Sequence, residues 1–146
     1  MPYRNGRYKN ADRIHILEDH FHGISKVYPT LADGVTLTCV NEATTWTLSA
    51  LVEIIPADTI TSWFDIHFIS IENISANGVY ELVLYSGAGD DEIARVRFTK
   101  TAAQDSTRNT TVMTPMVAPN SRIRAAIASD DDAGQTVDIS FNYHTY

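Results

Sequence analysis

The sequence predicts an all-β fold, a jelly-roll-like β-sandwich of about eight antiparallel strands that follows an extended N-terminal arm. Eight short apolar runs, rich in Val, Ile, Thr, Phe and Tyr, fill the chain from Val35 to its last residue. These residue types suit a pleated, half-buried surface. Each run ends at a turn signal, such as Asn77-Gly78, and no helical pattern separates the runs. Strands spaced in this way are typical of a sandwich or a barrel.

A jelly roll is the most economical sandwich, because eight strands divide into two four-stranded sheets that bury their inner faces against each other. A seven-stranded immunoglobulin-like sandwich is the alternative, but its Cys…Trp…Cys pattern is missing, since Cys39 is the only cysteine. The single cysteine also excludes an intramolecular disulfide and a Cys-rich zinc site. Its phase with Val35 and Leu37 predicts a small buried side chain.

The first 33 residues differ in character and are expected to form the arm, with the sandwich domain over residues 34–146. Residues 1–28 carry five Lys and Arg against three Asp and Glu, whereas the rest carries six against fifteen. An acidic body repels phosphates, so no direct contact with nucleic acid is expected. The sequence shows neither a stretch that could span a bilayer nor the apolar segment of a secretory signal, so no membrane partner is expected.

A short helix near 12–22 is the one helical element expected. Four apolar residues of the arm recur at helical spacing: Ile14, Leu17, Phe21 and Ile24. Asp12 is suited to cap the start of such a helix and Gly23 to end it. Pro29 then favours an extended exit from the arm.

The eight strands are expected at Val35–Val40, Trp46–Ile55, Phe64–Ile74, Val79–Ser86, Glu92–Lys100, Thr110–Val117, Arg122–Ser129 and Thr136–Tyr143. Successive strand residues point to opposite sides of a sheet, so alternation identifies the core face. Every second residue from Trp46 to Ile54 is predicted to face the core, and so is every second residue from Val137 to Tyr143.

The third expected strand changes phase within its length. Phe64, Ile66 and Phe68 share one parity, whereas Ile69 and Ile71 take the other. This change predicts a β-bulge near Phe68–Ile69, or a strand that is buried on both faces.

Three histidines in the arm form the densest set of potential metal ligands. His15, His20 and His22 lie close in sequence, but neither a helix nor a strand brings all three to one side. They are therefore expected to be surface or interface histidines, with metal binding as the alternative. No cofactor is expected.

The remaining polar groups do not make a catalytic site, so no enzymatic activity is expected. Asp65 and His67 share one side of their strand and His144 lies near the C-terminus, but a catalytic triad would also need a serine beside the base. Asp90–Glu92 and Asp130–Asp132 are acidic turns without the spacing of a calcium loop, and they are interpreted as solvated turns.

Five stretches carry a resemblance to a known family. They are FDIHFI at residues 64–69, NISAN at 73–77 with YEL, LY and GAG up to residue 89, IARVRFT at 93–99, PNSRI at 119–123, and VDIS with YHTY at 137–146. With these stretches the chain resembles small virion proteins of tailed phages that act as capsid cement, or decoration, proteins. The resemblance implies a jelly-roll-like protein that binds the outside of an icosahedral shell as a symmetric oligomer. It also implies that the protein stabilises the shell against packaged DNA, and it brings no catalytic residues.

The resemblance and the arm together predict a structural virion protein that binds the capsid surface through its N-terminal arm and one edge of the sandwich. It is expected to be made in the host cytoplasm. Its expected partners are the major capsid protein and further copies of itself, as a trimer or dimer. Aromatic, Arg and apolar side chains are favoured as interface anchors. The residues expected at the capsid or subunit interface are Tyr3, Arg4, Arg7, Tyr8, Arg13, Ile14, Leu17, Phe21, Tyr28 and Tyr146.

The alternative function is a receptor- or carbohydrate-binding module of a phage tail or baseplate. Such a module places exposed aromatic side chains on loops at one end of the sandwich. Trp63 is available for this role, whereas Trp46 is in phase with a core face. The sequence therefore favours the cement protein.

Overall fold

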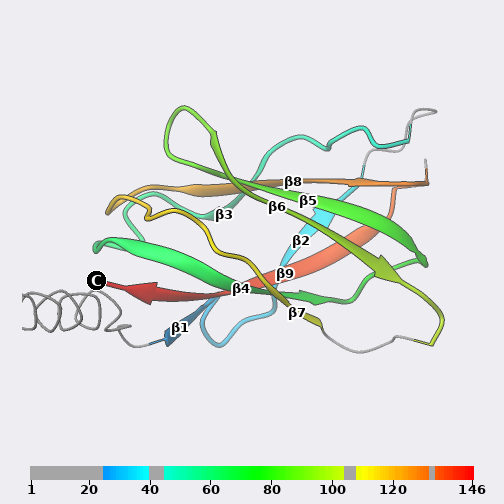
Figure 1. Cartoon of the computed structure of the whole chain (residues 1–146), viewed down its shortest axis with the longest axis horizontal. Helices are drawn as coiled ribbons and strands as arrows, with labels where there is room; N and C mark the ends of the chain where they lie inside the picture. Colours follow the sequence, from blue (N-terminus) through cyan, green and yellow to red (C-terminus); the bar gives the residue numbers. More distant parts are fainter. Residues whose placement is uncertain (1–24, 40–44, 104–107, 132–133) are drawn as a thin grey trace, which may run out of the picture.

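A computed structural model of the chain describes residues 25–39, 45–103, 108–131 and 134–146 (Figure 1). The described residues form nine strands: β1 (Ser25–Tyr28), β2 (Val35–Thr38), β3 (Val52–Ile55), β4 (Phe64–Glu72), β5 (Gly78–Ser86), β6 (Asp91–Lys100), β7 (Arg108–Thr111), β8 (Ile123–Ser129) and β9 (Thr136–Thr145). These parts of the chain contain no helix that is long and apolar enough to cross a membrane. The expected helix near 12–22 lies outside the described residues.

The strands build two antiparallel sheets that pack face to face (Figure 1). Sheet A has the order β1-β9-β4-β7, and β2 also pairs with β9, beside β1 along the same edge. Sheet B has the order β3-β8-β5-β6. From β2 onward, every connection except the β5–β6 hairpin passes from one sheet to the other. Because β1 and β2 act as one interrupted edge strand, eight strand positions remain, and the predicted jelly-roll-like sandwich is confirmed.

The core lies between the two sheets and takes alternate residues from each strand. In β9, Val137, Ile139 and Phe141 are completely buried, as the alternation predicts. In sheet B, the rings of Tyr80 and Phe98 stack with their centroids 5.2 Å apart. Cys39 is buried beside this core, as expected, and burial raises the pKa of its thiol. A free cysteine packs here as a small apolar residue.

A β-bulge interrupts the pairing of β4 with β9. Ile66 pairs with Tyr143 and Phe68 pairs with Asn142, so His67 is the extra residue. The bulge that the phase change predicted is confirmed, slightly earlier in the strand than expected.

Strand β3 is shorter than predicted. Of the expected strand Trp46–Ile55, only Val52–Ile55 is regular. The preceding residues still run beside β8, but the N–H of Ile127 donates to Oγ of Ser49 at 3.1 Å. A side-chain hydroxyl thus replaces the carbonyl that a regular ladder would use, and the strand pattern ends.

Strand β7 is shortened in the same way. Of the expected strand Thr110–Val117, only Thr110 and Thr111 fall within the regular part. The chain continues along β4, but the N–H of Ile66 donates to Oγ1 of Thr114 at 2.9 Å. The side-chain acceptor lies next to the bulge, where the ladder is already interrupted.

Trp46 was predicted to face the core, and this prediction is wrong. Its side chain is 41% exposed, and its backbone has a φ of 63°. A left-handed residue in a turn does not continue the alternation of a strand. The guanidinium carbon of Arg97 lies 4.7 Å from the centroid of the indole ring, which is a cation–π contact on the outside of sheet B.

Strand β1 was not predicted from the sequence. Ser25–Tyr28 pairs antiparallel with residues near the end of β9, from Phe141 to His144. The sheet therefore begins within the range 1–33 that the sequence assigned to the arm.

Gly34 lies where the chain comes closest to β9, and this close approach requires a glycine. A Cβ at this position would lie 2.8 Å from the backbone oxygen of Ile139 and 3.0 Å from its carbonyl carbon. We expect Gly34→Ala to destabilise the fold by about 1–3 kcal/mol in urea unfolding, because backbone must move. Gly89→Ala is the control: its nearest heavy atom is 3.7 Å away, and we expect a change within about 0.5 kcal/mol. Equal free energies of unfolding for the two variants would contradict this account.

Candidate functional site

The bulge at His67 determines which side chains sheet A presents on its outer face. Ile66 and Ile69 are completely buried, so the two residues between them, His67 and Phe68, both lie on the outer side. Asp65 lies on this side as well, by ordinary alternation. The outward-facing residues Asp65, His67 and Phe68 of β4 therefore lie close to the end of β9.

Exposed apolar side chains surround this point. We call them the apolar face, with exposed fractions from 41% to 84%: Val27, Trp63, Phe68, Met113, Met116 and Tyr146. Val27 and Phe68 flank Asn142 in register from the two neighbouring strands. Trp63 and Tyr146 are also neighbours, since the N–H of Tyr146 donates to the carbonyl of Trp63 at 2.9 Å. Aromatic residues and methionine are enriched in protein interfaces, so this face has the composition of a contact surface.

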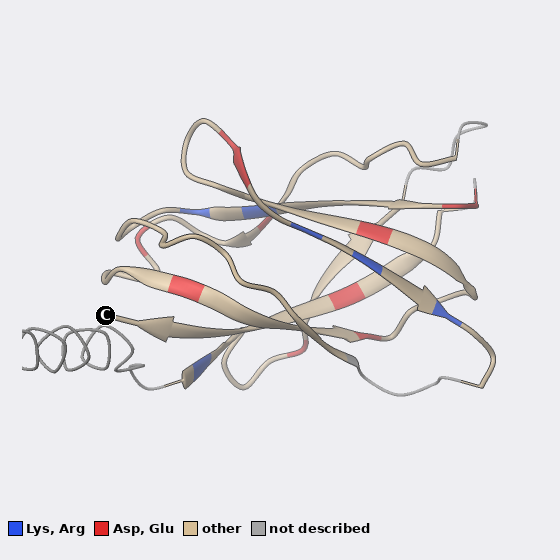
Figure 2. Cartoon of the chain, in the orientation of Figure 1, with Lys and Arg blue, Asp and Glu red and all other residues tan. Residues whose placement is uncertain are grey.

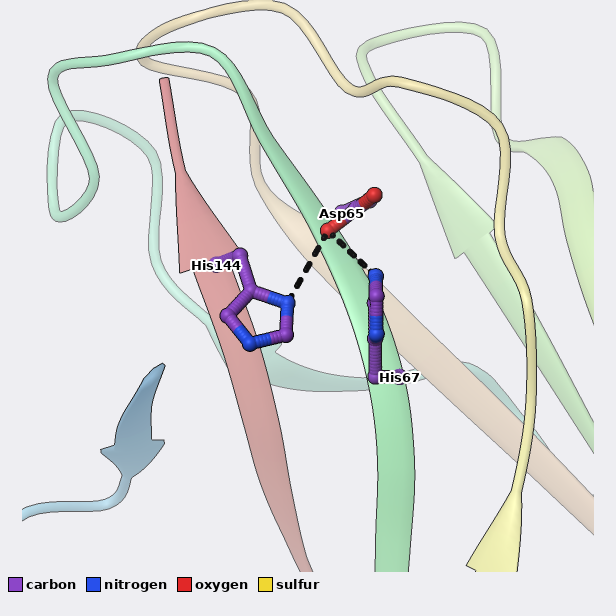
Figure 3. Close-up of side chains that lie close together, drawn as sticks. All are labelled: Asp65, His67 and His144. Atoms are coloured by element: carbon purple, nitrogen blue, oxygen red, sulfur yellow. Dashed lines mark ion pairs between the residues drawn. The ribbon is translucent and has the colours of Figure 1, made fainter. Parts of the chain in front are cut away.

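Asp65, His67 and His144 form a compact polar cluster within the apolar face (Figure 3). Oδ1 of Asp65 lies 3.0 Å from Nε2 of His67 and 3.8 Å from Nδ1 of His144. The two imidazole rings meet edge to face, with centroids 4.1 Å apart. The hydroxyl of Tyr146 donates to Oδ2 of the same carboxylate at 2.9 Å. Burial, followed by the hydrogen bond to Asp65, raises the pKa of Tyr146.

The outer face of sheet B has the opposite character. Figure 2 shows Lys and Arg gathered on β6 and β8, and these cations pair within the molecule. Arg97 and Arg95 both bond to Glu81, and these hydrogen bonds lower the pKa of its carboxyl. Arg124 of β8 pairs with Asp90 in the turn between β5 and β6. Charges are depleted in the centre of protein interfaces, so this ion-paired face resembles a solvated surface.

A groove of about 380 Å³ lies beside β1 and the segment that follows it. It is lined by Lys26, Val27, Pro29, Thr30, Leu31 and Tyr143. Leu31 is fully exposed, and its backbone has a φ of 54°.

Two of the predicted interface residues fall in the described parts of the chain. Tyr146 belongs to the apolar face, whereas Tyr28 is partly buried and packs against the core. The other predicted interface residues lie outside the described residues: Tyr3, Arg4, Arg7, Tyr8, Arg13, Ile14, Leu17 and Phe21. The same holds for His15, His20 and His22.

The sequence interpretation missed most of the apolar face. Phe68 had a detectable signal, because the phase change at the bulge implies one apolar residue on the outer side. Val27 had no such signal, since its strand was not recognised. Met113 and Met116 were placed in a strand that the structure shows to be irregular.

The two acidic turns hold the fold together where they are described. Asp90 pairs with Arg124, and Oδ1 of Asp130 accepts a hydrogen bond from the N–H of Val79 at 2.8 Å. Within the described residues, the one group of three potential metal ligands is Asp65, His67 and His144. The sequence named these three residues, but it did not bring them together.

Comparison with solved structures identifies the same fold in virus particles. A chain in the T13 particle of infectious bursal disease virus matches with a TM-score of 0.51 and 12% identity, over 86% of this chain and 32% of that chain. A chain in T=1 particles derived from infectious bursal virus matches with a TM-score of 0.50 and 12% identity, over 86% and 32%. The present chain thus spans about a third of the length of those chains. No protein-family model and no curated protein matches the sequence.

Proposed function

We propose that this chain is a structural protein of a virus particle, a cement or decoration protein on the outside of an icosahedral phage shell. In this proposal the outer face of sheet A and the N-terminal arm bind the major capsid protein. The protein is made in the host cytoplasm and joins the particle as a homo-oligomer, a trimer or dimer. It carries out no reaction.

The apolar face is the observation that carries this proposal. A jelly roll supports many functions, so the fold shared with virus-particle chains supports the role only by analogy. The surface adds an argument specific to this chain. Sheet A presents Trp63, Phe68 and Tyr146 to the outside, whereas sheet B presents paired charges. One face suited to contact and one suited to solvent are what attachment to a shell requires.

Because many copies attach to one particle, each single contact needs only a modest affinity. A particle offers a repeated surface, and an oligomer that engages several sites gains from a high effective concentration. The arm adds contacts beyond the sandwich, and its basic tip complements an acidic protein surface.

The alternative is a carbohydrate- or receptor-binding module of a tail or baseplate. The exposure of Trp46 favours it, since two tryptophans are now available instead of one. However, Trp46 lies over Arg97 of sheet B, whereas Trp63 neighbours Tyr146 of sheet A. The two rings therefore do not form one aromatic platform, and the cement role remains the better supported.

Substitution of exposed aromatics on the two sheets tests the proposal. We expect Trp63→Ser and Phe68→Ser each to weaken binding to purified shells by about tenfold or more, because exposed aromatics at an interface centre act as anchors. Trp46→Ser is the matched control on sheet B, and its binding is expected to equal that of the unchanged protein. Cosedimentation with shells measures the affinity, and thermal unfolding verifies that all three variants fold.

The pattern of losses identifies the contact surface. Loss confined to the sheet A variants supports the cement role. If Trp46→Ser loses binding while both sheet A variants keep it, sheet A is not the contact surface. Binding of any of these proteins to a glycan array, abolished by Trp46→Ser, would favour the carbohydrate module instead.

A further inference from the structure

The outer face of sheet A holds two imidazoles and one carboxylate that converge on a common point (Figure 3). We propose that Asp65, His67 and His144 bind a divalent transition-metal ion, with Zn²⁺ as the best match. The ion would join β4 to the end of β9 beside the C-terminus. This proposal does not depend on the capsid role.

The distances between the three side chains suit such an ion. Zn²⁺ binds His nitrogen and carboxylate oxygen at about 2.0–2.2 Å, so a tetrahedral site separates its ligand atoms by about 3.3 Å. Oδ1 of Asp65 lies 3.0 Å from one imidazole nitrogen and 3.8 Å from the other. One ligand atom from each of the three residues lies within 4.8 Å of the others. Small side-chain rotations therefore suffice to bring all three into coordination range.

The donor types select the class of metal. Neutral imidazole suits Zn²⁺, Cu²⁺, Ni²⁺ and Fe²⁺, whereas Ca²⁺ and Mg²⁺ prefer oxygen ligands alone. Two histidines and one aspartate supply three protein ligands and leave a fourth position open. The side chains are 14% to 19% exposed, so an ion can enter and the fourth position faces outward. That position is available to water or to a group from a neighbouring molecule.

Tyr146 holds the carboxylate of Asp65 in place through a hydrogen bond to its second oxygen. Its hydroxyl donates to Oδ2 of Asp65 at 2.9 Å, which leaves Oδ1 directed toward the two histidines. Oδ1 is buried and has no hydrogen-bond partner among the described residues. Partners that fix the second oxygen of a ligating carboxylate are a regular feature of metal sites.

Strand alternation places Asp65 and His67 on the same outer side of β4. The bulge at His67 keeps Phe68 on this side as well, so the cluster is bordered by an exposed ring. The register then places His144 directly opposite Asp65 on the neighbouring strand. Cross-strand partners of this kind have Cβ atoms about 4.5–5.5 Å apart, close enough to share one ion.

Zinc titration of the full chain tests the proposal. After dialysis against a chelator, we expect isothermal titration calorimetry with ZnCl₂ to give one ion per chain at micromolar or lower dissociation constant, and added Zn²⁺ to raise the Tm. His67→Ala and His144→Ala are each expected to lose about a hundredfold in affinity. Tyr146→Phe is expected to lose about tenfold, because it leaves the ligands in place but frees the carboxylate.

The chain contains a matched control, since its other three histidines all lie in the arm. The triple variant His15→Ala, His20→Ala, His22→Ala is expected to bind Zn²⁺ as the unchanged protein does. Circular dichroism verifies folding, and His144→Gln replaces His144→Ala if that variant unfolds. Visible absorption of bound Co²⁺ reports coordination independently. Absence of binding to the unchanged protein overturns the proposal, and so does binding that survives His67→Ala or His144→Ala, or that disappears in the triple variant.

Discussion

Deletion of residues 1–24 is expected to leave the sandwich folded and to abolish attachment to the shell. Within the described residues, the first strand is β1 and every buried hydrophobic residue lies at Leu37 or beyond. The deleted segment carries most of the proposed anchors, including Tyr3, Tyr8 and Phe21. Thermal unfolding is expected to show a cooperative transition at nearly the same Tm, while cosedimentation with shells falls to background.

The end point of the deletion matters because β1 begins at Ser25. Removal of residues 1–28 would also uncover the edge of β9 from Phe141 to His144, and it would confuse loss of attachment with loss of an edge strand. The deletion of residues 1–24 avoids this. If the protein lacking residues 1–24 binds shells as tightly as the full chain, the arm is not an anchor, and sheet A alone must account for attachment.

Phe141→Ala is expected to have the largest effect on stability. The ring is completely buried in β9, which pairs with β1 on one side and β4 on the other. Removal of a buried phenylalanine costs about 3–5 kcal/mol, from lost transfer free energy and from the cavity that remains. Urea unfolding followed by circular dichroism measures the free energy of unfolding.

Phe68→Ala provides the control for this prediction. It removes the same side chain from a neighbouring strand of the same sheet, but from the outer face. We expect a loss below about 1 kcal/mol, because the ring is already partly in water. Similar losses for Phe141→Ala and Phe68→Ala would mean that the core does not lie between the sheets as described.

Much of the fold follows from alternation with a period of two. The sequence placed β5, β6 and β8 within a residue of their observed ends, since each is a run of apolar and β-forming residues bounded by turn residues. The prediction of strand length was wrong where a side-chain hydroxyl replaces a backbone carbonyl as hydrogen-bond acceptor, at Ser49 and at Thr114. A Ser or Thr in an alternating run has the same pattern whether it points to solvent or accepts a ladder hydrogen bond.

The candidate site was less accessible to sequence reasoning. Asp65 and His67 share a side of one strand, which the sequence indicates. Their approach to His144 depends on the register between β4 and β9, and strands so far apart in sequence carry no local signal for it. Strand β1 was missed for the same reason, because four residues of mixed polarity become a strand only through their pairing with β9.

We propose that sheet A and the arm attach this protein to the outside of a capsid. Electron cryomicroscopy of the source particle can decide this, since density for a sandwich of this topology can be located and oriented. We expect density on the outer surface of the shell, with Trp63 and Phe68 turned toward the major capsid protein and the charged face of sheet B toward solvent. Density at the tail or baseplate, or a sandwich seated on the shell through sheet B, would contradict it.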